Sequence, residues 1–142
     1  MRLDRTFPLE DPAVEIPWRV SEAGFRMLVG GERLEQVVAG RLRQRCRLLG
    51  GLDADLTFHF SPIAGGQLRE IELLRHPKRH REREFDDLQQ RLERMLGPGE
   101  RLEPRLGLHP AGARWQLGAL RVTHEYYTAA GKDHEKVRFI HD

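Results

Sequence analysis

Seven histidines are the first residues of this chain whose chemistry could be catalytic or metal-binding. His76 and His80 are four positions apart, a spacing that can place two metal ligands on one face of a helix. Pro77 lies between them and argues against a helix interior, and no Cys, Asp or Glu lies at a spacing that completes a site. We interpret this pair as solvated loop histidines and expect no metal and no cofactor.

His124 differs because the alternation of its strand places it on the apolar face, where an earlier strand has Phe58. Buried polar groups normally find hydrogen-bond partners, so we expect a buried, satisfied histidine rather than a catalytic base. Its neighbour Glu125 points to the opposite face of the strand, and the two therefore do not form an acid–base dyad.

The candidate nucleophiles lack the partners that catalysis requires. Cys46 lies between Arg45 and Arg47, whose charges would lower a thiol pKa, but no histidine lies nearby in a recognisable signature. Ser21 is typical of a helix cap and Ser61 of a turn. The Gly-Gly pairs are not followed by the Lys-Ser/Thr of a phosphate-binding loop. We expect no catalytic residue, and hence no enzyme.

The densest charge is the run from Arg75 to Arg83, which holds five cations in nine residues. No aromatic residue interleaves with them to stack on bases, and acids follow at once, which disfavours a nucleic-acid patch. Three interpretations remain open: a solvated linker leading into a helix, an anchor for an acidic protein partner, and a phosphate-binding segment.

A ten-residue segment that occurs twice indicates how the helices and strands that carry these residues are arranged. Residues 26–35 (RMLVGGERLE) return as residues 94–103 (RMLGPGERLE), with eight of the ten identical. The correspondence continues downstream at an offset of 66, which pairs Phe58 with His124 and Ile71 with Val137. We interpret this as an internal repeat, one structural unit used twice.

Each unit is predicted to be a helix followed by a three-stranded antiparallel meander. The first helix follows Ser21 and ends at Gly30, and the second has an apolar stripe from Phe85 to Leu96 and ends at Gly97. Residues 32–43 are ambiguous, because their apolar spacing fits a short helix that Gly40 weakens. Strands are predicted near 45–49, 56–60, 68–74, 113–117, 119–127 and 134–140.

These elements predict an α+β fold, with a sheet of about six antiparallel strands and the helices on one of its faces. We expect one compact domain with an extended N-terminal arm at 1–16, a first repeat unit at 17–75, a basic linker at 76–84 and a second unit at 85–142.

Composition restricts the function further. The chain of 142 residues carries 24 Lys and Arg against 22 Asp and Glu, so its formal charge of +2 creates no broad field for nucleic acid or membrane. One cysteine cannot form an internal disulfide. Its first residues lack an apolar leader and no apolar run is long enough to span a bilayer, so we expect a cytoplasmic protein.

The repeat resembles a known kind of fold. Tandem units of a helix and antiparallel strands, with helices closed by Gly-Gly or Gly-Pro, are similar to the small bacterial inhibitor fold of the β-lactamase inhibitory protein. The segments 17–21 (PWRVS) and 85–99 also resemble small cytosolic immunity proteins that neutralise bacterial toxins. Such immunity proteins share no active-site motif, so the resemblance assigns no residue.

The resemblance implies a non-catalytic inhibitor, an immunity protein that binds a cognate toxin or effector domain through an exposed sheet face or a connecting loop. Arg, Trp and Tyr are the usual anchors of such interfaces. The alternatives are a nucleic-acid or phosphate-ligand module that uses the arginines of 75–83, and a structural subunit that forms a homo-oligomer. The predicted partner-binding residues are Arg75, Lys78, Arg79, Arg81, Arg83 and Tyr127.

Overall fold

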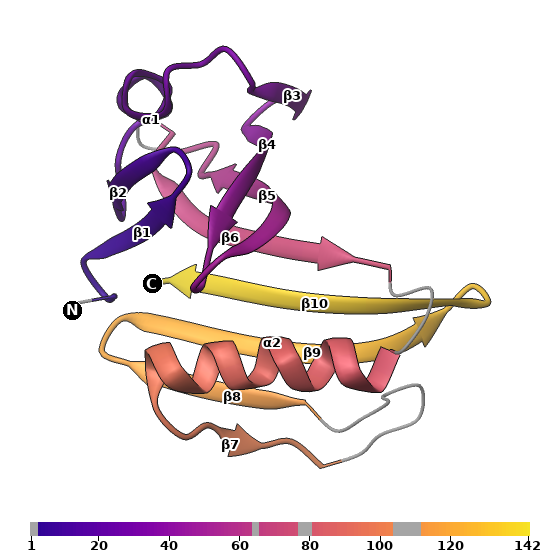
Figure 1. Ribbon diagram of the computed structural model, residues 1–142. Helices are drawn as coiled ribbons and strands as arrows, with labels where there is room; N and C mark the ends of the chain where they lie inside the picture. The colour runs from indigo at the N-terminus through magenta and orange to yellow at the C-terminus, as the bar shows by residue number, and fades with distance from the viewer. Residues whose placement is uncertain (1–2, 64–65, 77–80, 104–111) are drawn as a thin grey trace.

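The computed structural model describes residues 3–63, 66–76, 81–103 and 112–142, and it contains two helices and ten strands in those residues (Figure 1). The first half contains β1 (Thr6–Glu10), β2 (Ala13–Pro17), α1 (Glu22–Val29), β3 (Glu35–Val38), β4 (Arg41–Leu48), β5 (Leu52–Phe60) and β6 (Leu68–Arg75). The second half contains α2 (Arg81–Leu96), β7 (Glu100–Arg101), β8 (Ala113–Leu117), β9 (Leu120–Ala129) and β10 (Lys132–His141).

Strands β3 to β10 form one sheet in the order β3-β4-β5-β6-β10-β9-β8-β7, and every described pairing in it is antiparallel. The last strands of the two halves, β6 and β10, pair at its centre. The predicted α+β class with a large antiparallel sheet is confirmed. The sheet has eight strands where about six were predicted, because each half adds a short strand, β3 or β7, at an outer edge.

The ambiguous segment 32–43 is not helical: it forms β3 and the start of β4. Gly40 makes the turn between these strands with a φ of 78°, a left-handed conformation that favours glycine. The inward residues of β4 then alternate strictly with its outward arginines, which is the period of a strand. The N-terminal arm is also more regular than predicted, because it folds into the β1–β2 hairpin.

Both helices end at the predicted glycines, and α1 also begins where the sequence indicates. The Ser21 Oγ accepts a hydrogen bond from the Gly24 N–H (3.0 Å), and Gly30 closes α1 in the left-handed conformation. Gly97 has the same role for α2, with its N–H bonded to the Glu93 carbonyl (2.8 Å). Helix α2 begins at Arg81, so it includes the last residues of the segment predicted as a basic linker.

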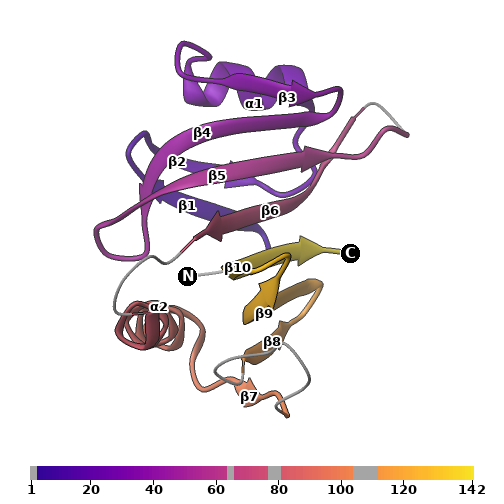
Figure 2. The ribbon, with the colours of Figure 1, turned by 90° about the vertical axis from the view of Figure 1, so that its right-hand side faces the viewer.

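One face of the sheet is covered by α1, the β1–β2 hairpin and α2, and a single apolar core lies beneath them (Figures 1 and 2). Aromatic contacts join each covering element to the sheet: Phe25 of α1 to Phe58 (4.5 Å), Phe7 of β1 to Phe139 (4.8 Å) and Phe85 of α2 to His124 (4.0 Å). Neither described helix combines the length and apolar character that crossing a bilayer requires.

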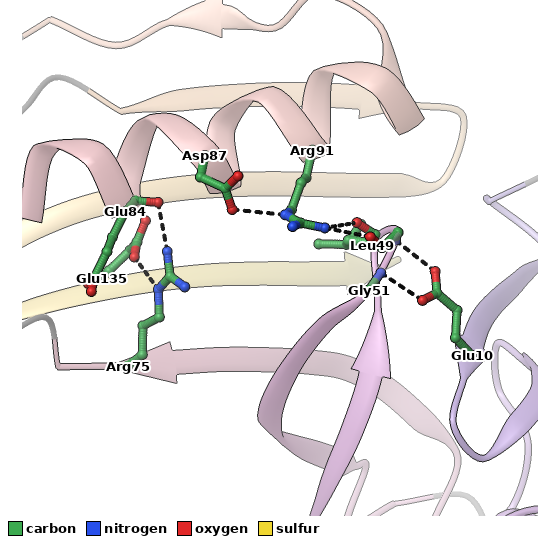
Figure 3. A network of polar contacts seen from close by, with 9 residues as sticks. Glu10, Leu49, Gly51, Arg75, Glu84, Asp87, Arg91 and Glu135 are labelled. Carbon is green, nitrogen blue, oxygen red and sulfur yellow. Dashed lines mark hydrogen bonds and ion pairs between the residues drawn. The ribbon is translucent and has the colours of Figure 1, made fainter.

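Polar contacts attach α2 to the first half of the molecule (Figure 3). The Arg91 guanidinium donates to the carbonyls of Leu49 (2.8 Å) and Gly50 (2.7 Å) in the β4–β5 turn, while Asp87 orients it (2.8 Å). From the other side of this turn, the Glu10 carboxylate accepts the Gly50 and Gly51 N–H groups (2.7 and 2.8 Å). The turn is therefore held between β1 and α2.

Candidate functional site

The face of the sheet opposite the helices, which we call the open face, is lined by charged residues of both signs. They pair across neighbouring strands, as Arg138 does with Glu70 (2.8 Å) and Lys136 with Glu72 (3.1 Å). Similar pairs extend toward both edges of the sheet: Arg43–Glu35, Arg45–Asp55, Arg47–Asp53 and Arg114–Glu100. This local pairing of opposite charges on the described strands suits a partner with a matching pattern of charges.

Three aromatic rings form a row at one end of the open face. His134 in β10 stacks on Tyr127 of β9, with ring centroids 5.1 Å apart, and His76 after β6 meets His134 edge-on at 4.7 Å. Leu74 in β6 is on the same face and is 39% exposed. We call His76, His134, Tyr127 and Leu74 the ring row. It is a partly exposed apolar and aromatic patch within a charged face.

The structure separates the residues predicted to bind a partner. Tyr127 lies in the ring row on the open face, and Arg83 is exposed on α2, which packs against the covered face. Arg75 points to the covered face, where its Nε bonds to the Glu135 carboxylate and its Nη2 to the Glu84 carbonyl (2.8 Å; Figure 3). Arg75 therefore attaches α2 to the sheet. Lys78 and Arg79 lie outside the described residues, as does the side chain of Arg81.

The predicted strands 119–127 and 134–140 contained the signal for part of the ring row, because the segment between them forms a hairpin turn. That turn places Tyr127 opposite His134, which is their register in the structure. The contribution of His76 depends on the pairing of β6 with β10, between residues more than fifty positions apart, and no local pattern specifies it.

A buried chain of polar groups lies beneath α2. His124 is fully buried, with Nδ1 2.7 Å from the Gln89 Oε1 and Nε2 2.7 Å from the Glu135 Oε2. Gln89 in turn donates to Glu93 (3.0 Å). The expected buried, satisfied histidine is present, with two partners rather than one. Sequence reasoning missed Glu135, because this acidic residue occupies an inward position in a strand rich in charged residues.

The protonation states of these buried polar groups follow from burial and hydrogen bonding. Burial lowers the pKa of His124 and outweighs the hydrogen bond and charge of Glu135, which raise it. Burial alone would raise the pKa of Glu135, but hydrogen bonds from His124 and Arg75 lower it below its ordinary value. A neutral imidazole has one N–H for two acceptors, and its ring lies against Phe85 with no solvent exposure. These buried polar groups are therefore placed to position α2 rather than to contact a substrate.

Two other groups have recognisable chemistry. Cys46 is buried, and burial raises the pKa of its thiol to about 11, so it is a poor nucleophile at neutral pH. On the open face, ligand atoms of His59, Glu70 and Glu72 lie within 4.8 Å of one another and could approach one metal ion. Arg138 and Lys136 already neutralise the two carboxylates.

Fold and site together define a class of protein: a small α+β protein whose antiparallel sheet is covered on one face, with a charged open face and a ring row. Neither a family model, nor a curated protein, nor a solved structure matches this chain.

Proposed function

We propose that this protein is a non-catalytic, protein-binding inhibitor of the immunity-protein kind, which acts in the bacterial cytoplasm by binding a toxin or effector domain. The observation that carries the proposal is the ring row on the open face, and Tyr127 is the residue of that row that we assign as the main anchor. This role replaces that of Arg75, whose guanidinium is engaged with α2 and Glu135.

The ring row has the composition of an interface centre. Tyrosine supplies a large contact area with little loss of conformational freedom, and stacking on His134 holds the Tyr127 ring in place before a partner arrives. Beside the row, the pair of Lys136 and Glu72 offers charges of both signs, which favours one matching partner over others. A few anchors surrounded by weakly contributing polar groups is the usual distribution of binding energy.

The two halves are also proposed to be copies of one unit. The repeated segment, 26–35 and 94–103, extends in each half from the last turn of the helix into the next strand, from α1 to β3 and from α2 to β7. Phe58 and His124, which correspond at the offset of 66, both lie in the third strand after the helix of their half and contact an aromatic ring of that helix. This equivalence supports duplication followed by a change from an apolar to a polar contact in the second half.

Partner capture with variants tests the proposed function. The tagged chain and its Tyr127→Ala variant are used to capture proteins from the source cells with and without nuclease. We expect the wild type to retain one protein in stoichiometric amount despite nuclease, and Tyr127→Ala to lose at least 90% of it, because about 2 kcal/mol or more is typical of a central anchor. Met27→Ala, at an 85% exposed residue of α1, is the control and should retain it.

A growth assay with the captured protein then tests whether binding by this chain inhibits it. Expressed alone it should arrest growth, and co-expression of the wild-type chain, but not of Tyr127→Ala, should restore growth. Material that disappears with nuclease would instead favour the nucleic-acid alternative, whose binding falls steeply with salt. A captured protein that is harmless when expressed, or that Tyr127→Ala retains fully, would overturn the proposal.

A further inference from the structure

Within the described residues, part of strand β8 has no partner strand on one side, and a groove lies beside it. Its neighbour β7 is only two residues long and pairs with Ala113 and Arg114. The remaining residues of β8, from Trp115 to Leu117, pair with β9 on one side and with no described strand on the other. A groove of about 500 Å³ follows this free edge.

The ladder pattern shows which backbone groups point into the groove. The Leu102 N–H donates to the Gly112 carbonyl (2.9 Å), and Arg114 pairs with Glu100, so these alternate residues of the strand face β7. By the same alternation, the N–H and C=O of Gln116 point toward the β7 side of the strand, at a position that lies beyond the end of β7. Continued register would place Pro98 opposite Gln116, and proline has no N–H to offer.

Trp115 explains why the chain leaves this edge open. Its indole N–H donates to the Gly97 carbonyl (2.9 Å), and a Cβ at Gly99 would lie only 2.6 Å from the indole ring. The segment between α2 and β7 is thus drawn over the Trp115 ring instead of along β8. The apolar side of the groove is lined by Leu96, Pro98 and Leu117 together with this indole.

Charge on the other side of the groove indicates the chemistry of the occupant. Glu100 is paired to Arg114 by two hydrogen bonds (both 3.0 Å), whereas the ion pair of Arg121 with Asp142 is longer, with 3.9 Å between Nη2 and Oδ1. Arg121 is opposite Gln116 in the register of β8 and β9, and both side chains are on the open face. An acidic side chain opposite Gln116 would therefore share its row with the most weakly paired arginine of the groove.

We propose that this groove binds an extended peptide segment of a partner protein, which adds to β8 as a strand and carries an acidic residue between two apolar ones. The acidic residue exchanges backbone hydrogen bonds with Gln116 and directs its carboxylate toward Arg121. Its two neighbours, on the opposite face of the added strand, contact Leu117 and the Leu96–Pro98 wall. This site is separate from the ring row and does not depend on the proposed inhibitor function.

Selection from a displayed library of random heptapeptides on the immobilised full chain tests the proposal. We expect enrichment of apolar–acidic–apolar sequences, and we would measure the affinity of one enriched synthetic peptide by titration calorimetry. Gln116→Pro removes the outward N–H, at an edge position where proline is tolerated, and should weaken binding about tenfold or more. Gln116→Ala keeps this N–H and should bind as the wild type does.

Charge exchange and peptide chemistry complete the test. Arg121→Glu should weaken the selected peptide and prefer its acid-to-lysine analogue. N-methylation of the peptide's acidic residue removes the N–H that bonds to Gln116 and should abolish binding. N-methylation of the next residue, whose N–H points away from β8, should not. This comparison uses the wild-type protein, so it remains valid even if Gln116→Pro fails to fold. Failure to enrich any peptide, or peptides indifferent to Gln116→Pro, Arg121→Glu and methylation, would overturn the proposal. Tyr127→Ala should leave peptide binding unchanged, so the two binding sites are tested independently.

Discussion

At the scale of single residues, position in the sheet decides what each ionisable group can do. Glu135 and Glu125 are in adjacent strands, yet Glu135 faces the core and bonds to His124 and Arg75 while Glu125 lies on the open face. The buried group must be paired to be tolerated, because an unpaired charge in the core is strongly destabilising. Side-chain type alone could not distinguish these roles, since only the register of β9 with β10 brings Glu135 to His124.

His124→Phe tests the buried chain. The variant keeps the ring contact with Phe85 but leaves the acceptors of Gln89 and Glu135 without the imidazole, so we expect the free energy of unfolding at pH 7 to fall by about 1–3 kcal/mol in urea titrations. His134→Phe, which retains a ring on the open face, is the matched control and should change stability little.

The same variant isolates the pH dependence. Because burial lowers the pKa of His124 in the folded state, the unfolded chain binds more protons below the ordinary value of 6.5. The wild type should therefore lose stability as the pH falls from 6.5 through the folded-state pKa, and His124→Phe should lack this component. A wild type that gains stability relative to the variant on acidification would show instead that His124 is an imidazolium in the fold.

At the scale of elements, long amphipathic segments were predictable and short edge strands were not. The apolar stripe of α2 is correct, and Phe85, Leu88 and Leu92 are buried as that pattern requires. Strands β3 and β7 are exposed and carry no alternation, so the sequence offered no period to recognise. The Gly97-Pro98-Gly99 stop was predicted for the helix, but the need for Gly99 arises from the distant Trp115 ring.

Arg91→Ala tests how α2 is attached to the sheet. The change removes the donors to the Leu49 and Gly50 carbonyls, and hydrogen bonds from a charged group contribute about 1.5–3 kcal/mol, so thermal and urea unfolding should show a loss of that size. Arg94→Ala, an exposed residue of the same helix, is the control. Equal stability of the two variants would mean that apolar packing alone positions α2.

At the scale of the whole molecule, the two halves share one sheet and one core. The β6–β10 pairing crosses the centre, and rows of inward residues such as Phe58, Ile71, Phe139 and Val122 continue from one half into the other. The sequence predicted two units and one antiparallel sheet, but it did not predict that β6 pairs with β10. Pairing the last strands of the two halves depends on contacts between residues 60 or more positions apart. The same limit hid the ring row, to which both halves contribute.

A continuous core predicts that the halves unfold together. Trp18 lies in the N-terminal region, stacked on His141, and Trp115 lies in β8 of the second half, so each can report on its surroundings. In the single-tryptophan variants Trp18→Phe and Trp115→Phe, urea unfolding followed by fluorescence should coincide, within each variant, with unfolding followed by far-ultraviolet circular dichroism. The slope should also match the surface of one 142-residue unit. If fluorescence and circular dichroism gave separate midpoints in either variant, the halves would be independent folding units, and the contacts across β6 and β10 would only join two domains that are stable alone.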